Sequence, residues 1–137
     1  MTTPESGQTA SGAHHDFASV DELAPYALMD GVRARAVHGE RITFAVMDLA
    51  PSIGLPEHRH PSEQLGMVVQ GEFTFTVGGE TRVRRPGDMW VIPPDVPHTV
   101  EATGSEGCTV IETFSPPRAE WADVPREQPA PGAWPPR

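Results

Sequence analysis

Short alternations of apolar and polar residues, separated by turns rich in Gly and Pro, run through the middle of the chain. Val32–His38 (VRARAVH) is typical, and its alternation indicates a half-buried strand. The same pattern predicts further strands at 41–49, 57–60, 64–70, 73–77, 81–85, 89–92, 98–101 and 109–114. Only the segment 17–29 has room for a helical turn, which Pro25 would end. These nine short strands, with almost no helix, predict an antiparallel sandwich or barrel.

Length and proline content predict one domain with two irregular ends. The chain has 137 residues, enough for one core. Residues 1–16 are small, polar and without period, so we expect a disordered or loosely docked lead-in. Residues 17–118 would form the barrel, and the Pro-rich residues 119–137 would wrap over its surface as an irregular tail anchored by Trp121.

The composition excludes several classes of function. The net charge of −9 argues against binding to nucleic acid or to an anionic membrane. No apolar run approaches the ~20 residues that span a bilayer and no signal-like segment is seen, so we expect a cytoplasmic protein. All ten basic residues are Arg, which excludes lysine Schiff bases and a Walker-type phosphate loop. Cys108 is the single cysteine, and we interpret it as a core residue rather than a catalytic thiol.

The histidines suggest a metal site. His58 and His60 are two residues apart, so in a strand their imidazoles would share one face. Gln64 has the same parity, and His98 follows after a long interval in PGDMWVIPPDVPHTV. Imidazole is a common neutral metal ligand, and four such side chains could hold one divalent ion. The competing interpretation is that His58 and His60 are merely polar loop residues beside prolines.

The spacing of these residues resembles the two motifs of the cupin family. The first motif, G-x5-H-x-H-x(3,4)-E-x6-G, is similar to the run from Gly54 to Gly71, except that three residues precede the first histidine and Gln64 replaces Glu. The second motif, G-x5-P-x-G-x2-H-x3-N, matches Gly87 to His98, with Asp95 and Ala102 as departures. The resemblance implies a single cupin (double-stranded β-helix, or jelly-roll) barrel that holds one nickel, zinc, iron, cobalt or manganese ion.

The glutamine has a chemical meaning if it is the fourth ligand. Strand parity favours Gln64 over its neighbour Glu63, unless a bulge after Pro61 resets the phase. Three imidazoles and one amide are neutral and leave the ion its full charge, which favours polarising a substrate oxygen over redox cycling. Oxygen-dependent chemistry stays open.

A closer resemblance is to the small cupins of pectin-degradation pathways, carried by HPSEQLGMVVQGEFTFTVGGE and VIETFSPPRAEW. Those proteins convert unsaturated monouronates, and the positions that match their substrate-binding acid, Phe and Arg are Glu112, Phe114 and Arg118. Glu112 stands where that family has Asp. On its own chemistry, an inward Glu112 could move a proton and Arg118 could hold a carboxylate. The alternatives are an outward strand residue and a surface salt bridge.

Further apolar residues are candidates for the pocket wall. Met67, Trp90 and Tyr26 could line the pocket, although packing in the core is the simpler explanation for each of them. The arginines that alternate along the predicted strands are most simply solvated: Arg33, Arg35, Arg82 and Arg84.

Together these features predict a metal-dependent enzyme for proton transfer on a small oxygen-rich carboxylate such as an unsaturated uronate, by ring opening, tautomerisation or cyclisation. The alternatives are a dioxygenase, a lyase, a biosynthetic cyclase acting on an enol or polyketide-like substrate, and a non-catalytic ligand-binding barrel. Cupins commonly pair through edge strands, and Val32–His38 looks like such an edge, so we expect a homodimer that binds a small molecule, with no nucleic acid or membrane partner.

Overall fold

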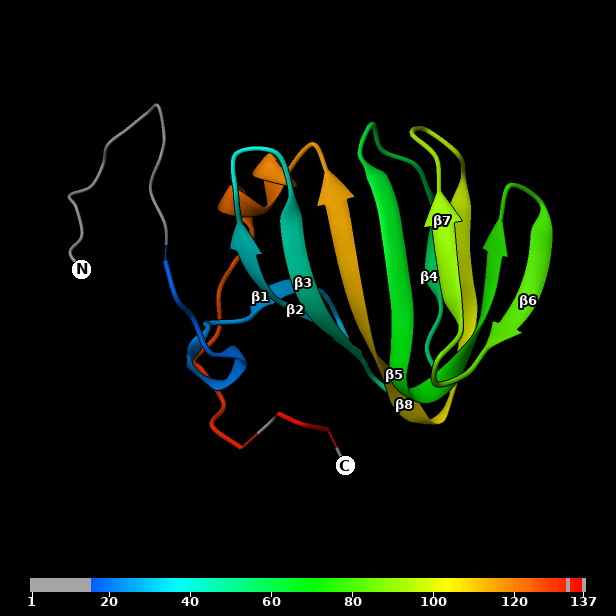
Figure 1. Cartoon of the computed structure of the whole chain (residues 1–137). Coiled ribbons are helices and arrows are strands. Elements are labelled where there is room, and N and C mark those ends of the chain that lie inside the picture. Colours follow the sequence, from blue (N-terminus) through cyan, green and yellow to red (C-terminus); the bar gives the residue numbers. More distant parts are fainter. Residues whose placement is uncertain (1–15, 133, 137) are drawn as a thin grey trace.

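The computed structural model describes residues 16–132 and 134–136, so residues 1–15 of the expected lead-in lie outside the described part. The described residues form an all-β barrel with two short 3-10 helices (Figure 1). No described helix has the length and apolar character needed to cross a membrane. The elements are η1 (Val20–Glu22), β1 (Tyr26–Met29), β2 (Val32–His38), β3 (Thr43–Leu49), β4 (Leu55–His58), β5 (Glu63–Val77), β6 (Glu80–Arg84), β7 (Met89–Ile92), β8 (His98–Ser115) and η2 (Ala119–Asp123).

Two long strands, β5 and β8, hold the barrel together because each contributes to two sheets. The first half of β5 pairs antiparallel with the second half of β8, as at Gln64 and Phe114. Its second half pairs with the first half of β8, as at Phe75 and Val100. One sheet therefore runs β1-β2-β3-β8-β5-β7, and the other runs β4-β8-β5-β6. The expected antiparallel barrel is confirmed, and its interior lies between these two sheets.

The prediction of separate strands at 64–70 and 73–77 is wrong, because Gly71 forms a bulge and not a turn. Its φ of 80° lies in the left-handed region, and the ladder shifts register around it. A Cβ at Gly71 would lie 2.1 Å from the carbonyl oxygen of Gly107. The bulge lets β5 bend from one sheet to the other. In the same way, the predicted strands at 98–101 and 109–114 are two parts of β8.

The lead-in and the tail complete one edge of the barrel. The helical turn expected before Pro25 is present as η1, but β1 has no counterpart in the prediction. The tail runs beside β1, where the Ala27 amide donates to the Pro125 carbonyl at 2.9 Å (Figure 1). Trp121 in η2 is only 3% exposed, so the first part of the tail is an ordered, packed segment.

The position of β2 weakens one argument for a dimer. β2 is hydrogen-bonded to β3 along its length, and its first residues, Val32–Ala34, are also paired with β1, so this part of the strand is not a free edge. The sequence pattern pointed to an edge there because β1 was not predicted.

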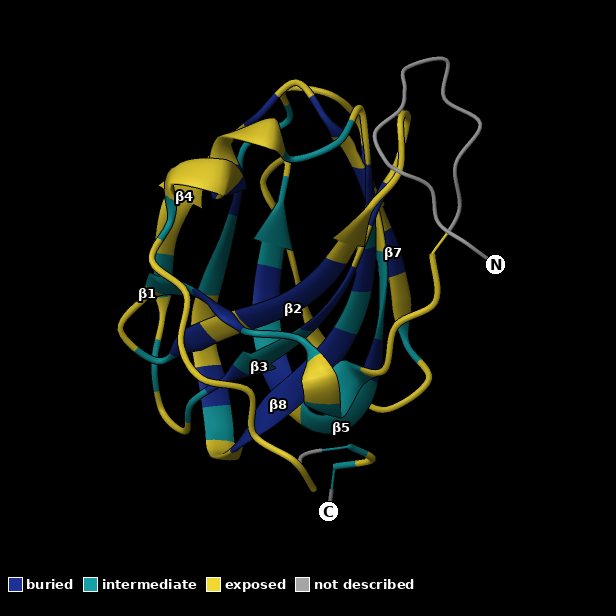
Figure 2. Cartoon of the chain, turned by 90° about the vertical axis from the view of Figure 1, so that its left-hand side faces the viewer, coloured by how far each residue is buried: buried dark blue, intermediate teal, exposed yellow. Residues whose placement is uncertain are grey.

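Buried residues concentrate in β2, β3 and β8 (Figure 2), where both faces of the strands are covered over part of their length. Cys108 belongs to the apolar core, and burial raises the pKa of its thiol to about 12.

The expectation that Arg35 is solvated is wrong. It is 5% exposed, and its Nη1 donates to Asp48 at 2.6 Å, so the adjacent strand supplies the partner for its charge.

Candidate metal centre

Three imidazoles converge at one end of the barrel interior. His58 ends β4, His98 begins β8, and the two residues are paired in the antiparallel register. His60 lies in the loop after β4. Its position is fixed by a hydrogen bond in which the Asp95 backbone amide donates to the His60 carbonyl oxygen at 2.8 Å. Their ligand atoms all lie within 4.8 Å of one another. The predicted strand 57–60 ends two residues early, so the loop, and not strand parity, brings His60 to the cluster.

The backbone sets the tautomer of each ring. His58 Nδ1 lies 3.1 Å from the Pro56 carbonyl oxygen, and His98 Nδ1 lies 2.9 Å from that of Val96. His60 Nδ1 makes the same contact with Ser62 at 3.0 Å. A carbonyl oxygen can only accept, so each Nδ1 carries the proton and each Nε2 presents a lone pair. Fixing the far nitrogen in this way is how proteins orient histidine ligands.

The Nε2 atoms have the environment of metal ligands. His98 Nε2 is buried and has no hydrogen-bond partner among the described residues. His60 Nε2 lies 3.0 Å from Gln64 Oε1, and with His60 protonated at Nδ1 both atoms are acceptors. Two acceptors at this distance repel each other unless a cation lies between or beside them. The donor set therefore fits a divalent ion bound by His58, His60 and His98, with Gln64 as a fourth ligand.

Burial favours the neutral form of His60 and His98. The pKa of His98 is lowered to about 4, first by desolvation and also by the neighbouring histidines and Arg118, against the opposing effect of the hydrogen bond to Val96. The pKa of His60 is lowered as well, first by desolvation and then by Arg118. Neutral imidazole is the form that binds a metal, so the site is ready to accept an ion at neutral pH.

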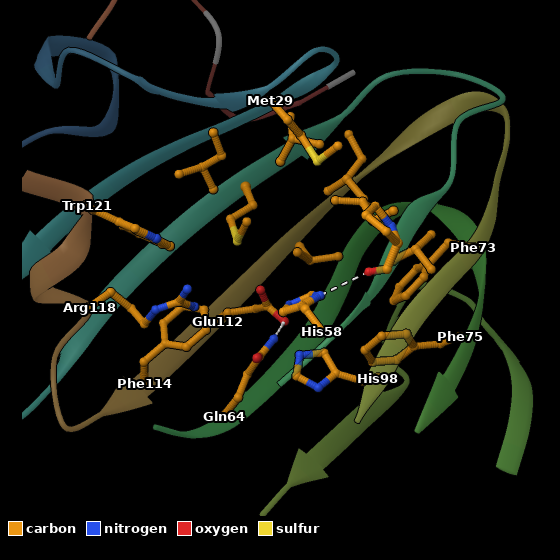
Figure 3. A pocket seen from close by; sticks show the side chains of 18 of the residues that line it. Met29, His58, Gln64, Phe73, Phe75, His98, Glu112, Phe114, Arg118 and Trp121 are labelled. Atoms are coloured by element: carbon orange, nitrogen blue, oxygen red, sulfur yellow. Dashed lines mark hydrogen bonds between the residues drawn. The ribbon is translucent and has the colours of Figure 1, made fainter. Parts of the chain in front are cut away.

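Gln64, and not Glu63, faces the histidines. Gln64 is 5% exposed and points inward, whereas Glu63 points to the outside of the barrel and is exposed. The amide is held in one orientation because Gln64 Nε2 donates a short hydrogen bond to Glu112 Oε2 (Figure 3). With its nitrogen engaged by Glu112, Gln64 directs its oxygen to the histidines.

Glu112 lies inward on β8, and two donors converge on one of its oxygens. Trp90 Nε1 donates to Oε2 at 3.1 Å, and Gln64 donates to the same atom. Trp90 can reach Glu112 because its indole occupies the space above Gly66, where a Cβ would lie 2.5 Å from the ring. Burial raises the pKa of Glu112 to about 7, although both hydrogen bonds and Arg118 act to lower it. A carboxyl with this pKa can both take up and release a proton near neutral pH.

A cavity of about 390 Å³ extends from this polar end (Figure 3). Arg118 lines it with a guanidinium that stacks 4.8 Å from the centre of the Phe114 ring and 5.1 Å from that of Trp121. Arg118 Nε also donates to Glu120 at 2.6 Å, so the residue makes an ion pair and faces the cavity at once. Phe114 and Trp90 line the cavity as well.

Two candidate pocket residues lie elsewhere. Met67 is not among the described residues that line the cavity, because it alternates with inward Gln64 and Val68 and so points to the outer face. Tyr26 is also outside the lining. Its ring packs 5.6 Å from that of Trp121, and its hydroxyl hydrogen-bonds to His38 Nε2 at 3.0 Å.

Some wall residues were not anticipated from the sequence. β1 contributes Leu28 and Met29, and the tail contributes Trp121 and Val124. Their only signal in the sequence is that they are apolar, and their place in the cavity follows from the packing of both chain ends against the barrel.

The antiparallel barrel and the inward histidine cluster define the class: a β-barrel protein with a candidate metal centre. The cupin-domain family model matches residues 45–114, just over half of the 137 residues, so the chain belongs to the cupin family. The pectin degradation protein KdgF of Dickeya dadantii (strain 3937) is 28% identical over 105 residues, covering 74% of this chain and 94% of that protein. The structure of KdgF from Halomonas sp. is 26% identical with a TM-score of 0.71, covering 77% of this chain and 97% of that one.

A shorter similarity connects the chain to a second relative. H2HPP isomerase of Bacillus subtilis is 39% identical over 49 residues, which cover 35% of this chain and 21% of that protein. The expected resemblance to the pectin-degradation cupins is confirmed, and the similarity to a named isomerase is an addition to it.

Proposed function

We propose that this cupin is a metal-dependent enzyme that moves a proton on a small carboxylate-bearing molecule, as an isomerase does. The observation that carries the proposal is Glu112, a buried carboxyl with a pKa of about 7 that is hydrogen-bonded to Gln64 beside three convergent imidazoles. Similarity to KdgF and to a protein named as an isomerase supports this reaction class.

His58, His60 and His98 would hold the ion, with the Gln64 oxygen as a fourth ligand. Nickel, zinc, iron, cobalt and manganese all accept such nitrogen and oxygen ligands. A bound divalent ion would supply Lewis-acid polarisation of a substrate oxygen.

Glu112 would carry the proton. Its Oε2 is held by Trp90 and Gln64, which leaves Oε1 for a substrate in the cavity that Glu112 lines. In an isomerisation, the carboxylate takes a proton from one carbon and returns it to another, so no net proton or electron is gained or lost. The pKa of about 7 suits both halves of this exchange.

Arg118 would position the substrate. Its Nε is occupied by Glu120, but a guanidinium has further N–H donors that can hold a carboxylate. Stacking against Phe114 and Trp121 limits the rotation of this group and would fix the direction from which the carboxylate is held.

The test combines metal analysis with hydrogen exchange. Purified wild type, Glu112→Gln and Glu63→Gln would be incubated in D₂O with an unsaturated monouronate and with a series of 2-oxo acids. Elemental analysis would give metal per chain, NMR would follow deuterium incorporation, and an electrode would follow oxygen. We expect about one ion per chain in all three proteins. Exchange should occur in wild type and in the control Glu63→Gln, whose carboxylate is on the outside, but not in Glu112→Gln.

Two results would overturn the proposal. One is wild type that binds no metal even after reconstitution. The other is oxygen consumption in step with product, which would make the protein a dioxygenase.

A further inference from the structure

The cavity has one polar end and an apolar remainder. Among the described residues, and apart from the indoles of Trp90 and Trp121, its polar lining consists of His58, Gln64, His98, Glu112 and Arg118. The other lining residues are hydrocarbon, aromatic or thioether side chains: Leu28, Met29, Val32, Met47, Leu49, Leu55, Pro56, Phe73, Phe75, Val100, Val110, Phe114 and Val124. They come from both sheets and from the tail, so a ligand in the cavity meets apolar surface on more than one side.

The backbone offers little to a polar ligand here. β3 is paired with β2 and with β8, and β8 is paired with β3 and β5. Their N–H and C=O groups are therefore used in the sheet and not available in the cavity. Of the polar side chains, His58, Gln64 and His98 are assigned to the ion, and the Trp90 N–H is used by Glu112.

This wall penalises a polyhydroxylated ligand. A hydroxyl that enters the cavity loses its hydrogen bonds to water, and beyond the polar end it meets side chains that cannot replace them. A hydrocarbon ring or chain loses nothing on leaving water and gains contact with the wall. Phe73 and Phe75, whose ring centres lie 4.9 Å apart, add aromatic surface suited to packing against a ring.

We infer that the substrate is a carboxylate on a hydrocarbon skeleton, cyclic or chain-like, and not a polyhydroxylated sugar acid. This inference rests on the proposed function for the placement of the carboxylate at Arg118 and of the reacting oxygen at the metal end. Size does not discriminate, because about 390 Å³ accepts either kind of molecule. The apolar character of the wall is what distinguishes a hydrocarbon carboxylate from a sugar acid.

The test is a comparison of two probes by titration calorimetry on the protein as purified, with its metal. The probes are 3-phenylpropanoate and galacturonate, each with one carboxylate. We expect 3-phenylpropanoate to bind at least about tenfold more tightly, with a negative heat-capacity change that reports burial of apolar surface. Equal or tighter binding of galacturonate, or failure of 3-phenylpropanoate to bind, would overturn the inference.

A matched pair of variants locates the effect. Met47→Gln puts an amide of similar size on the cavity wall, whereas Met67→Gln makes the same change on the outer face of the same sheet. Met47→Gln should weaken 3-phenylpropanoate about tenfold while Met67→Gln leaves it unchanged. If Met47→Gln has no effect, or Met67→Gln an equal one, the wall is not the binding surface and the inference fails.

The two proposals can fail separately. Binding of the probes requires no turnover, so the preference of the wall can hold in a protein that exchanges no deuterium. Conversely, deuterium exchange that depends on Glu112 together with tight galacturonate binding would keep the reaction class and reject the hydrocarbon substrate.

Discussion

The two ends of the cavity are built in different ways. At the metal end, polar side chains are oriented by other polar atoms: the Val96 carbonyl fixes His98, and Glu112 holds Gln64 (Figure 3). At the other end, residues distant in sequence, such as Leu28 and Val124, are brought together by backbone pairing between β1 and the tail and by packing, and their own side chains are apolar. The metal end therefore depends on exact hydrogen-bond geometry, and the apolar end depends on shape and the exclusion of water. Substitutions at the metal end should therefore affect metal binding and proton transfer, whereas substitutions at the apolar end should affect ligand affinity and stability.

The largest effect should come from removing a ligand. His98→Ala deletes the buried Nε2 that has no partner among the described residues, and elemental analysis should show metal falling from about one ion per chain to near zero. His38→Ala is the control, because His38 bonds to Tyr26 and Thr43 away from the cluster and its loss should leave the metal in place. Full metal content in His98→Ala would contradict the assignment.

The next effect separates the proton carrier from the ligands. Glu112→Gln keeps the shape of the side chain and an oxygen that can accept from Trp90, so the metal should stay. The rate of deuterium exchange on the probe that wild type turns over should fall by about 10²- to 10⁴-fold. If the variant loses both metal and exchange, Glu112 acts only by orienting Gln64. Metal analysis on the sample used for the exchange assay distinguishes this role from that of a proton carrier.

A smaller effect is expected where the two ends meet. Arg118→Met keeps a long side chain against Phe114 and Trp121 but removes the charge. The KM for a carboxylate substrate should rise about 10- to 100-fold, the cost of a charge-assisted hydrogen bond, with little change in kcat. Arg82→Met provides the matched change on an exposed arginine and should alter neither value. A fall in kcat alone would contradict the positioning role.

The smallest expected effect concerns Cys108, in the core beside the apolar part of the cavity wall. Cys108 packs in the core with Val32 and Leu49, which also line the cavity. Its folded pKa of about 12 lies above the ordinary pKa of a cysteine thiol, 9.0, so the thiol of the folded state keeps its proton to higher pH than that of the unfolded state. The stability that this difference contributes is present below pH 9 and is lost as the pH rises from there toward 12.

Denaturant titrations across this pH range should therefore show a decline in the free energy of unfolding that is reduced in Cys108→Ala. An alkylating reagent at pH 8 should leave the thiol of the folded protein intact, because the reactive form is the thiolate. Rapid alkylation without unfolding would mean that water reaches the core behind the cavity.

The comparison also explains which features could be read from the sequence. The metal end follows from short spacings, since His58, His60, Gln64 and His98 lie in two motifs that carry their chemistry in their residue types. The strand pattern was mostly correct because alternation reflects burial. The junction at Gly71 was misread, because a glycine in a bulge and a glycine in a turn look alike in sequence.

The apolar end could not be predicted, for a physical reason. Whether Leu28 or Val124 packs in a core or borders a cavity depends on which segments close the barrel edge, and that is decided by contacts between β1 and the tail. Parity alone would have placed Met67 outside, since it alternates with inward Gln64. The outward position of Met67 is therefore predictable from the sequence.

Gly66 matters for adapting the protein to another working pH. A single added methyl group there would collide with the Trp90 indole and remove a donor that lowers the pKa of Glu112. The absence of a side chain at Gly66, which pairs with Glu112 in the β5–β8 ladder, thus influences the proton affinity of this acid through Trp90. Engineering the protein for more alkaline conditions could begin at this glycine, because the change raises the pKa of the acid through Trp90 without substituting any of the metal-ligand candidates.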